Sequence, residues 1–92
     1  MDDTDAVRVW MVERTYSDDE QNIIIITYAT TDGDRYLRKE RALTSFDDVR
    51  DTTAAVTASP DDLGAVRDED RRRRYATEAR RMAAAHDPED VV

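Results

Sequence analysis

Apolar and polar positions alternate in the first part of the chain. Residues of one parity are Val7, Val9 and Met11, and those of the other are Trp10, Val12 and Tyr16. Because successive side chains of a strand point to opposite faces, this pattern predicts a β-strand over about residues 6–16. The run Ile23 to Tyr28 has no polar side, which predicts a second strand that needs cover on both faces.

Turn residues follow the second strand and predict a hairpin. Asp32-Gly33 is typical of a tight two-residue turn, so residues 35–43 should fold back antiparallel. Their charged side chains suit a strand at the edge of the sheet. Residues 44–58 fit either a helix or a strand, and the β-branched residues favour a short fourth strand over about 52–58.

Helix signals dominate the rest of the chain. Ser59 followed by Pro60 is a typical helix start, and the composition is strongly helix-forming from about Asp68 to Ala85. Asp87-Pro88 ends this helix. On a helical wheel one stripe is apolar or small and is expected to face the sheet. Its members are Tyr75, Ala79, Met82 and His86, flanked by Ala76 and Ala83.

These elements predict an α+β fold: a small antiparallel three- to four-stranded β-meander with a C-terminal α-helix packed on one face. No linker or repeat divides the chain, so residues 1–92 should form a single domain. Within it we expect a sheet region over about 6–58 and a helical region over about 60–86. Acidic tails are expected at 1–5 and 87–92.

Charge adds a second kind of information. The 92 residues hold 22 acids and 14 bases, a formal net charge of -8; 16 of the acids are Asp, and Lys39 stands alone among 13 arginines. This composition resembles that of small acidic proteins of halophilic archaea, where molar salt screens self-repulsion. The alternative is a mildly acidic protein from a GC-rich genome in which codon bias favours Arg over Lys.

Several kinds of chemistry lack the residues they need. The chain has no Cys, which excludes disulfides and thiolate chemistry, and its only imidazole, His86, lies at a predicted helix end where a capping or packing role suffices. No nucleophile elbow or glycine-rich phosphate loop is present. We therefore expect no enzyme activity, no cofactor and no metal site. The acidic N-terminus and the short apolar runs predict a cytoplasmic protein without a membrane segment.

The arginines of the helical region allow two interpretations. They could bind phosphates, with Arg73, Arg74, Arg80 and Arg81 as candidate contacts, joined by Arg35, Arg38, Lys39 and Arg41 of the predicted edge strand. Alternatively, Asp68, Glu69 and Asp70 each precede an arginine by four residues, the spacing of ion pairs along a solvated helix. The net charge of -8 opposes polyanion binding except where salt screens it.

One helix can shield only one face of a sheet, which leaves the other face to be covered. If residues 44–58 are helical, they could provide that cover. If they form a strand, the exposed apolar face predicts a contact surface and, most simply, a homodimer. The residues expected at that surface are Val7, Val9, Met11, Ile23 and Ile25.

Two functions therefore follow from the sequence. The first is a non-enzymatic interaction or accessory protein that associates with itself through an apolar sheet face and binds an unknown protein partner. The second is a nucleic-acid-binding protein that uses the helix arginines. The second is favoured if the basic strand and the helix arginines form one surface, and disfavoured if acids interleave them.

Overall fold

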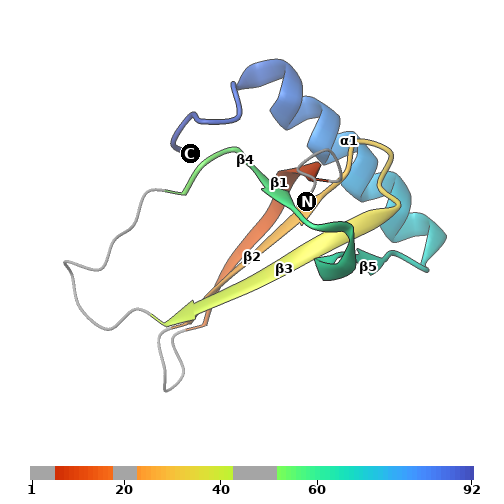
Figure 1. Ribbon diagram of the computed structural model, residues 1–92, viewed down its shortest axis with the longest axis horizontal. Coiled ribbons are helices and arrows are strands. Elements are labelled where there is room, and N and C mark those ends of the chain that lie inside the picture. Colours follow the sequence, from red (N-terminus) through yellow and green to blue (C-terminus); the bar gives the residue numbers. More distant parts are fainter. Residues whose placement is uncertain (1–5, 18–22, 43–51) are drawn as a thin grey trace.

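The computed structural model describes residues 6–17, 23–42 and 52–92, which form one antiparallel sheet with an α-helix against it (Figure 1). The sheet has five strands in the order β4-β1-β2-β3-β5. The elements are β1 (Val7–Ser17), β2 (Ile23–Ala29), β3 (Arg35–Ala42), β4 (Ala55–Ala58), β5 (Gly64–Ala65) and α1 (Glu69–Ala85). The predicted α+β class is confirmed, as is a fourth strand at the end of the ambiguous segment. The two-residue β5 was not predicted. Predictions for residues 1–5 and 43–51 lie outside the described residues.

A bulge interrupts β1 near its middle. Met11 lies opposite Tyr28 and Glu13 lies opposite Thr27, so Val12 is an additional residue in β1. Because side chains alternate with a period of two, one extra residue moves every following side chain to the other face. The prediction of which face each side chain of this strand points to is therefore wrong beyond the bulge.

The β2–β3 hairpin contains the predicted glycine turn, but its loop has five residues, 30–34, instead of two. The Thr30 N–H donates to the carbonyl of Arg35 (3.1 Å), and the Gly33 N–H donates to the carbonyl of Thr30 (2.9 Å). Gly33 has a φ of +74°, in the left-handed region. A Cβ there would lie 2.1 Å from the carbonyl oxygen of Arg72, so the loop backbone rests directly against α1.

A carboxylate organises the same loop. The Thr30 hydroxyl donates to Asp32 Oδ1, and the Asp34 N–H donates to the same atom at 2.9 Å. These two hydrogen bonds, in that order, hold the pKa of Asp32 below its ordinary value of 3.8. A carboxylate with a lowered pKa stabilises the folded chain above its ordinary pKa, and this contribution is lost as the pH falls through the folded value.

We therefore expect Asp32→Asn to cost about 1 kcal/mol at neutral pH and progressively less below pH 4, because the hydrogen bonds to the charged form then no longer distinguish the two proteins. Urea denaturation of both proteins between about pH 2 and pH 7 measures this difference. Asp34→Asn is the matched control, since Asp34 contributes only backbone groups to the hydrogen bonds described: its N–H donates to Asp32, and its carbonyl accepts the Val66 N–H. A stability difference that does not change with pH would contradict the assignment.

The face of the sheet turned away from α1 is covered by the connection between β4 and β5. These strands lie at opposite edges, and residues 59–63 cross the face between them (Figure 1). The crossing contains the 3-10 helix η3 (Pro60–Asp62), and the Ser59 hydroxyl accepts from the Asp61 N–H at 3.3 Å, as the predicted helix start requires. Leu63 packs against the core cluster beneath. That cluster consists of Val9, Met11, Ile24, Ile26 and Tyr28.

α1 covers the opposite face with the predicted stripe. Asp68 caps its first turn, accepting from the Arg71 N–H at 2.9 Å, and Ala79 is completely buried against the cluster that contains Trp10. The small side chain of Ala79 lets helix and sheet approach closely. No helix within the described ranges is long and apolar enough to cross a lipid bilayer.

Residues 88–92, predicted as an acidic tail, are instead part of the fold. The N–H groups of Ala54 and Ala55 donate to the carbonyls of Asp90 (2.8 Å) and Pro88 (3.1 Å), and the Val92 N–H donates to a carbonyl at residue 52 (2.9 Å). Val92 also packs against two core clusters. The segment therefore covers backbone groups that would otherwise be exposed beside β4.

Candidate anion-binding groove

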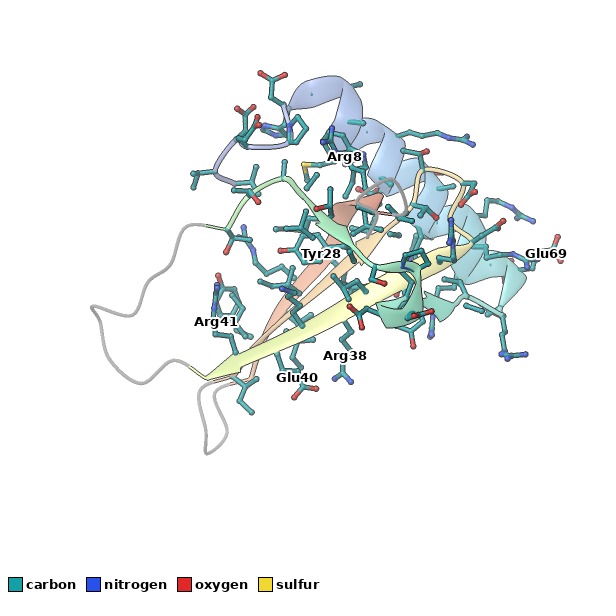
Figure 2. The ribbon with its side chains drawn as sticks, viewed as in Figure 1. Arg8, Tyr28, Arg38, Glu40, Arg41 and Glu69 are labelled. Carbon is teal, nitrogen blue, oxygen red and sulfur yellow. The ribbon has the colours of Figure 1, made fainter. Side chains whose placement is uncertain are left out.

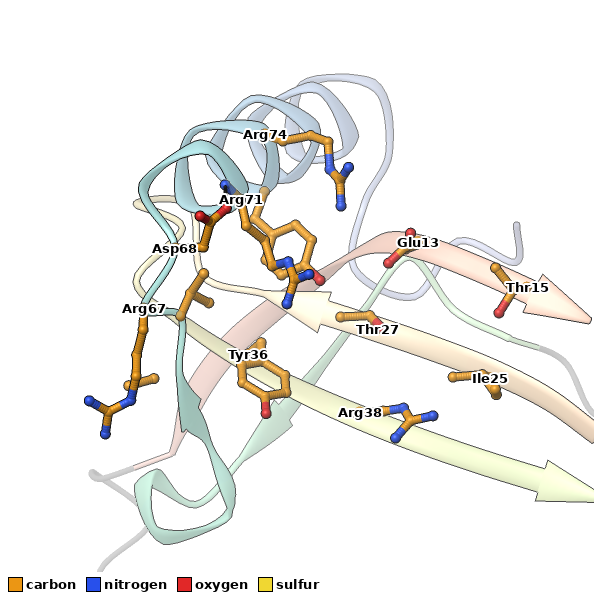
Figure 3. A pocket seen from close by; sticks show the side chains of 13 residues that line it. Glu13, Thr15, Ile25, Thr27, Tyr36, Arg38, Arg67, Asp68, Arg71 and Arg74 are labelled. Atoms are coloured by element: carbon orange, nitrogen blue, oxygen red, sulfur yellow. Dashed lines mark hydrogen bonds between the residues drawn. The ribbon is translucent and has the colours of Figure 1, made fainter.

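A groove of about 760 Å³ lies between the first half of α1 and the part of the sheet that extends beyond the helix (Figure 3). Its floor comes from β1, β2 and β3, and its walls come from α1 and from the connection between β5 and α1. The lining residues whose contacts matter below are Glu13, Thr27, Tyr36, Arg38, Arg71 and Arg74.

The bulge in β1 determines which side chains reach the floor. Beyond Val12, Glu13 and Thr15 share a face with Thr27 of β2, and all three line the groove. Ile25 lies beside them on the same face of β2. The floor therefore combines hydroxyl groups with apolar surface.

Four arginines line this groove, and they come from three parts of the fold. Arg38 belongs to β3, Arg67 to the β5–α1 connection, and Arg71 and Arg74 to α1. Residues three apart on a helix lie on the same side, so the side chains of Arg71 and Arg74 extend into the same part of the groove. Figure 3 shows both side chains extending from α1 toward the sheet.

Two carboxylates also line the groove. Asp68 is already engaged, because its carboxylate accepts the Arg71 N–H at the start of α1. Glu13 is exposed on β1. Figure 3 shows the Arg67 side chain directed away from the other lining side chains, so the guanidinium groups of Arg38, Arg71 and Arg74 face two carboxylates and leave this surface positive within a chain whose net charge is -8.

Two arginines of α1 outside the groove, Arg73 and Arg81, are paired with acids. Arg73 lies 3.6 Å from Glu69 and 3.9 Å from Asp70, and Arg81 lies 3.5 Å from Glu78. Of the three pairs that the four-residue spacing predicts, only Glu69–Arg73 forms. These side chains are largely exposed, so each pair contributes little to stability.

The two groove arginines of α1 differ from these paired ones. Within the described part of the chain, no carboxylate oxygen lies within 4.0 Å of the guanidinium nitrogens of Arg71 or Arg74. The guanidinium of Arg74 lies 5.7 Å from the centre of the Tyr75 ring. Arg38 has a partner, Glu40, at 3.0 Å, but both side chains are about half exposed. The charges of Arg71 and Arg74 are therefore available to a ligand.

The predicted phosphate contacts are only partly brought together. Of Arg73, Arg74, Arg80 and Arg81, only Arg74 lines the groove, and among the predicted strand residues Arg35, Arg38, Lys39 and Arg41, only Arg38 does. Lys39 and Arg41 lie on the other face of β3 by alternation. Sequence reasoning missed Arg67 and Arg71. The available signal for Arg71 was its position one helical turn before Tyr75, the first residue of the buried stripe.

The residues predicted for self-association do not form one surface. Val9 is 0% and Met11 is 5% exposed, and both belong to the chain's own core, against which Val7 packs. Val9 and Met11 are therefore not on a surface that a second copy can reach, and Val7 is partly buried. Ile23 and Ile25 lie on the opposite face of the sheet, and Ile25 lines the groove. Association into a homodimer stays a prediction.

A second pair of arginines acts on the face away from α1, as Figure 2 shows for Arg41 and Tyr28. Arg41 Nη2 donates to Thr52 Oγ1 at 3.2 Å, and Arg14 Nη1 donates to the Val92 carbonyl at 3.0 Å. Burial raises the pKa of Tyr28, and the charges of Arg41 and Arg14 partly offset this effect. These two hydrogen bonds hold the chain at Thr52 and at Val92 against the sheet.

Fold and groove together define a class: a small antiparallel α+β protein with an arginine-lined groove between its helix and its sheet. The chain belongs to a family of unknown function, DUF7967, whose family model matches residues 2–92. No curated protein matches the chain, and no solved structure does.

Proposed function

We propose that this protein is a non-catalytic nucleic-acid-binding protein that holds a phosphate backbone in its groove. The observation that carries the proposal is the convergence of Arg38, Arg71 and Arg74 on one space. Strand β3 and α1 contribute one predicted arginine each to this surface, Arg38 and Arg74, while Lys39 and Arg41 lie on the other face of β3 and Glu40 pairs with Arg38. The acids in the lining, Asp68 and Glu13, leave that surface positive.

Guanidinium groups suit this role because their planar fork of N–H donors matches two phosphate oxygens at once. Arg71 and Arg74 have no described carboxylate partner, so a phosphate would not need to displace one. The overall charge of -8 repels a polyanion at long range, and this repulsion is screened within about 10 Å at 0.1 M salt. A positive groove can then act locally.

The proposal does not include catalysis because the groove lacks a recognisable acid–base pair. Its lining contains threonine hydroxyls but no histidine or cysteine. A hydroxyl nucleophile needs a base held beside it. The Asp68 carboxylate caps the helix, and Glu13, opposite Thr27, is exposed and has no described contact that holds it against the Thr27 hydroxyl. Binding is therefore the activity that these side chains support.

Fluorescence anisotropy with a labelled single-stranded 12-nucleotide DNA tests this function. At about 50 mM salt we expect the double variant Arg71→Glu/Arg74→Glu to bind at least about tenfold more weakly than the wild type. The affinity of the wild type should fall as the salt concentration rises, because the release of counterions drives phosphate binding. Arg80→Glu/Arg81→Glu is the matched control, since it makes the same charge change on α1 outside the groove. No binding by the wild type, or an equal loss in both variants, would sink the proposal.

A further inference from the structure

The groove has an aromatic side chain on its floor as well as arginines on its walls. Tyr36 of β3 is partly exposed and packs against a cluster formed by Ala29, Val66 and Tyr75 (Figure 3). Its backbone is paired on both sides, with Ala29 of β2 and with Gly64 of β5. The ring is therefore held by packing and by paired backbone on both sides, while part of it faces the groove.

Gly64 explains how the ring fits in this position. A Cβ on Gly64 would lie 2.6 Å from Cε1 and 2.8 Å from Cζ of Tyr36, which is closer than such atoms can approach. The ring therefore occupies space that a side chain at residue 64 would fill. The two-residue strand β5 thus places a bare backbone behind the ring and leaves the groove side of the ring free for contact.

We infer that the groove binds an unpaired nucleotide of a single-stranded nucleic acid, with its base stacked on Tyr36 and a neighbouring phosphate held by Arg71 and Arg74. This inference rests on the proposed function and names its ligand. An aromatic platform beside a basic wall is the combination by which proteins bind single strands. A base that remains paired inside a duplex cannot place its flat side on a ring at the floor of a groove.

The side chains around the ring agree with this assignment. Thr27 lies on the same face of the sheet, diagonally across from Tyr36, and offers a hydroxyl group; Ile25 lies further along β2 and adds apolar surface to the floor. The guanidinium groups of Arg71 and Arg74 extend over this floor from α1. A nucleotide has the same division into a flat, largely apolar base and a charged phosphate.

The test compares two labelled strands of 12 units that carry the same phosphates: oligothymidylate, and an abasic strand without bases. We expect wild-type protein to bind oligothymidylate about fivefold or more tightly than the abasic strand, since stacking on an aromatic ring adds affinity for each base. Tyr36→Phe should keep this preference because it keeps the ring. Tyr36→Leu should remove it, so that this variant binds the two strands equally.

A measurement on the wild type avoids dependence on the folding of the leucine variant. Stacking places the Tyr36 ring protons in the ring current of a base, so their NMR signals should move upfield with oligothymidylate and stay in place with the abasic strand. Equal binding of the two strands by wild-type protein would overturn this inference and leave the proposed function standing. Failure to bind either strand would overturn the proposed function itself.

Discussion

Replacing Gly33 by alanine should destabilise the protein by about 3 kcal/mol, because two penalties act at one position. The backbone φ of +74° is unfavourable for residues with a Cβ. The new Cβ would also lie 2.1 Å from the carbonyl oxygen of Arg72 and 3.0 Å from the Ala76 nitrogen. Both of these are backbone atoms of α1, so relief requires the whole helix to shift away from the hairpin loop. Urea denaturation monitored by circular dichroism measures the loss.

A second substitution separates the two penalties. Asparagine tolerates the left-handed region better than alanine does, but it carries the same Cβ. If contact with α1 dominates, Gly33→Asn should be as destabilising as Gly33→Ala. Thr31→Ala is the control, since Thr31 is an exposed residue of the same loop. An alanine variant within about 0.5 kcal/mol of wild type, the range of ordinary surface substitutions, would show that loop and helix do not touch.

Removal of residues 88–92 should also destabilise the fold by about 3 kcal/mol, since three backbone hydrogen bonds of about 1 kcal/mol each are lost. Val92 additionally leaves two core clusters, and Arg14 loses its carbonyl partner. An acidic tail would give a different result, because deleting solvated residues changes the free energy of unfolding very little.

Point variants in the intact chain show where this stability lies. Val92→Ala should reproduce part of the loss, because it removes a partly buried side chain and keeps the backbone bonds. Val91→Ala should be nearly neutral, since the Val91 side chain is 60% exposed. A shortened chain as stable as the wild type in urea denaturation would mean that residues 88–92 do not hold β4.

Local signals in the sequence predicted the elements well. The helix expected over about 68–85 forms over Glu69–Ala85, with Asp68 as its cap, because capping, composition and a following proline all act within a few residues. The same holds for the hairpin glycine and for the turn at Ser59. These features depend on neighbouring residues alone, so one sequence suffices to find them.

Features that depend on distant residues were missed. The crossing from β4 to β5 covers a face that seemed open, because no local pattern shows that residue 63 will pack under β1 and β2. The bulge places Tyr16 on the face opposite Trp10, contrary to the alternation of the sequence. The composition of the groove also depends on residues that are distant in the sequence. The arginines that reach it are determined by where α1 crosses the sheet, which a helical wheel does not contain.

Because of the bulge at Val12, the side chains that face the groove depend on the register of β1 against β2. Beyond it, Glu13 and Thr15 face the groove, and Arg14 and Tyr16 face the other side. If β1 lost the bulge but kept all its residues, each residue after Met11 would move one position along β2, and these pairs would exchange faces. The groove would then gain a cation and an aromatic ring and lose a carboxylate without any substitution at its walls. The register of β1 against β2 therefore determines which side chains the groove offers to a ligand.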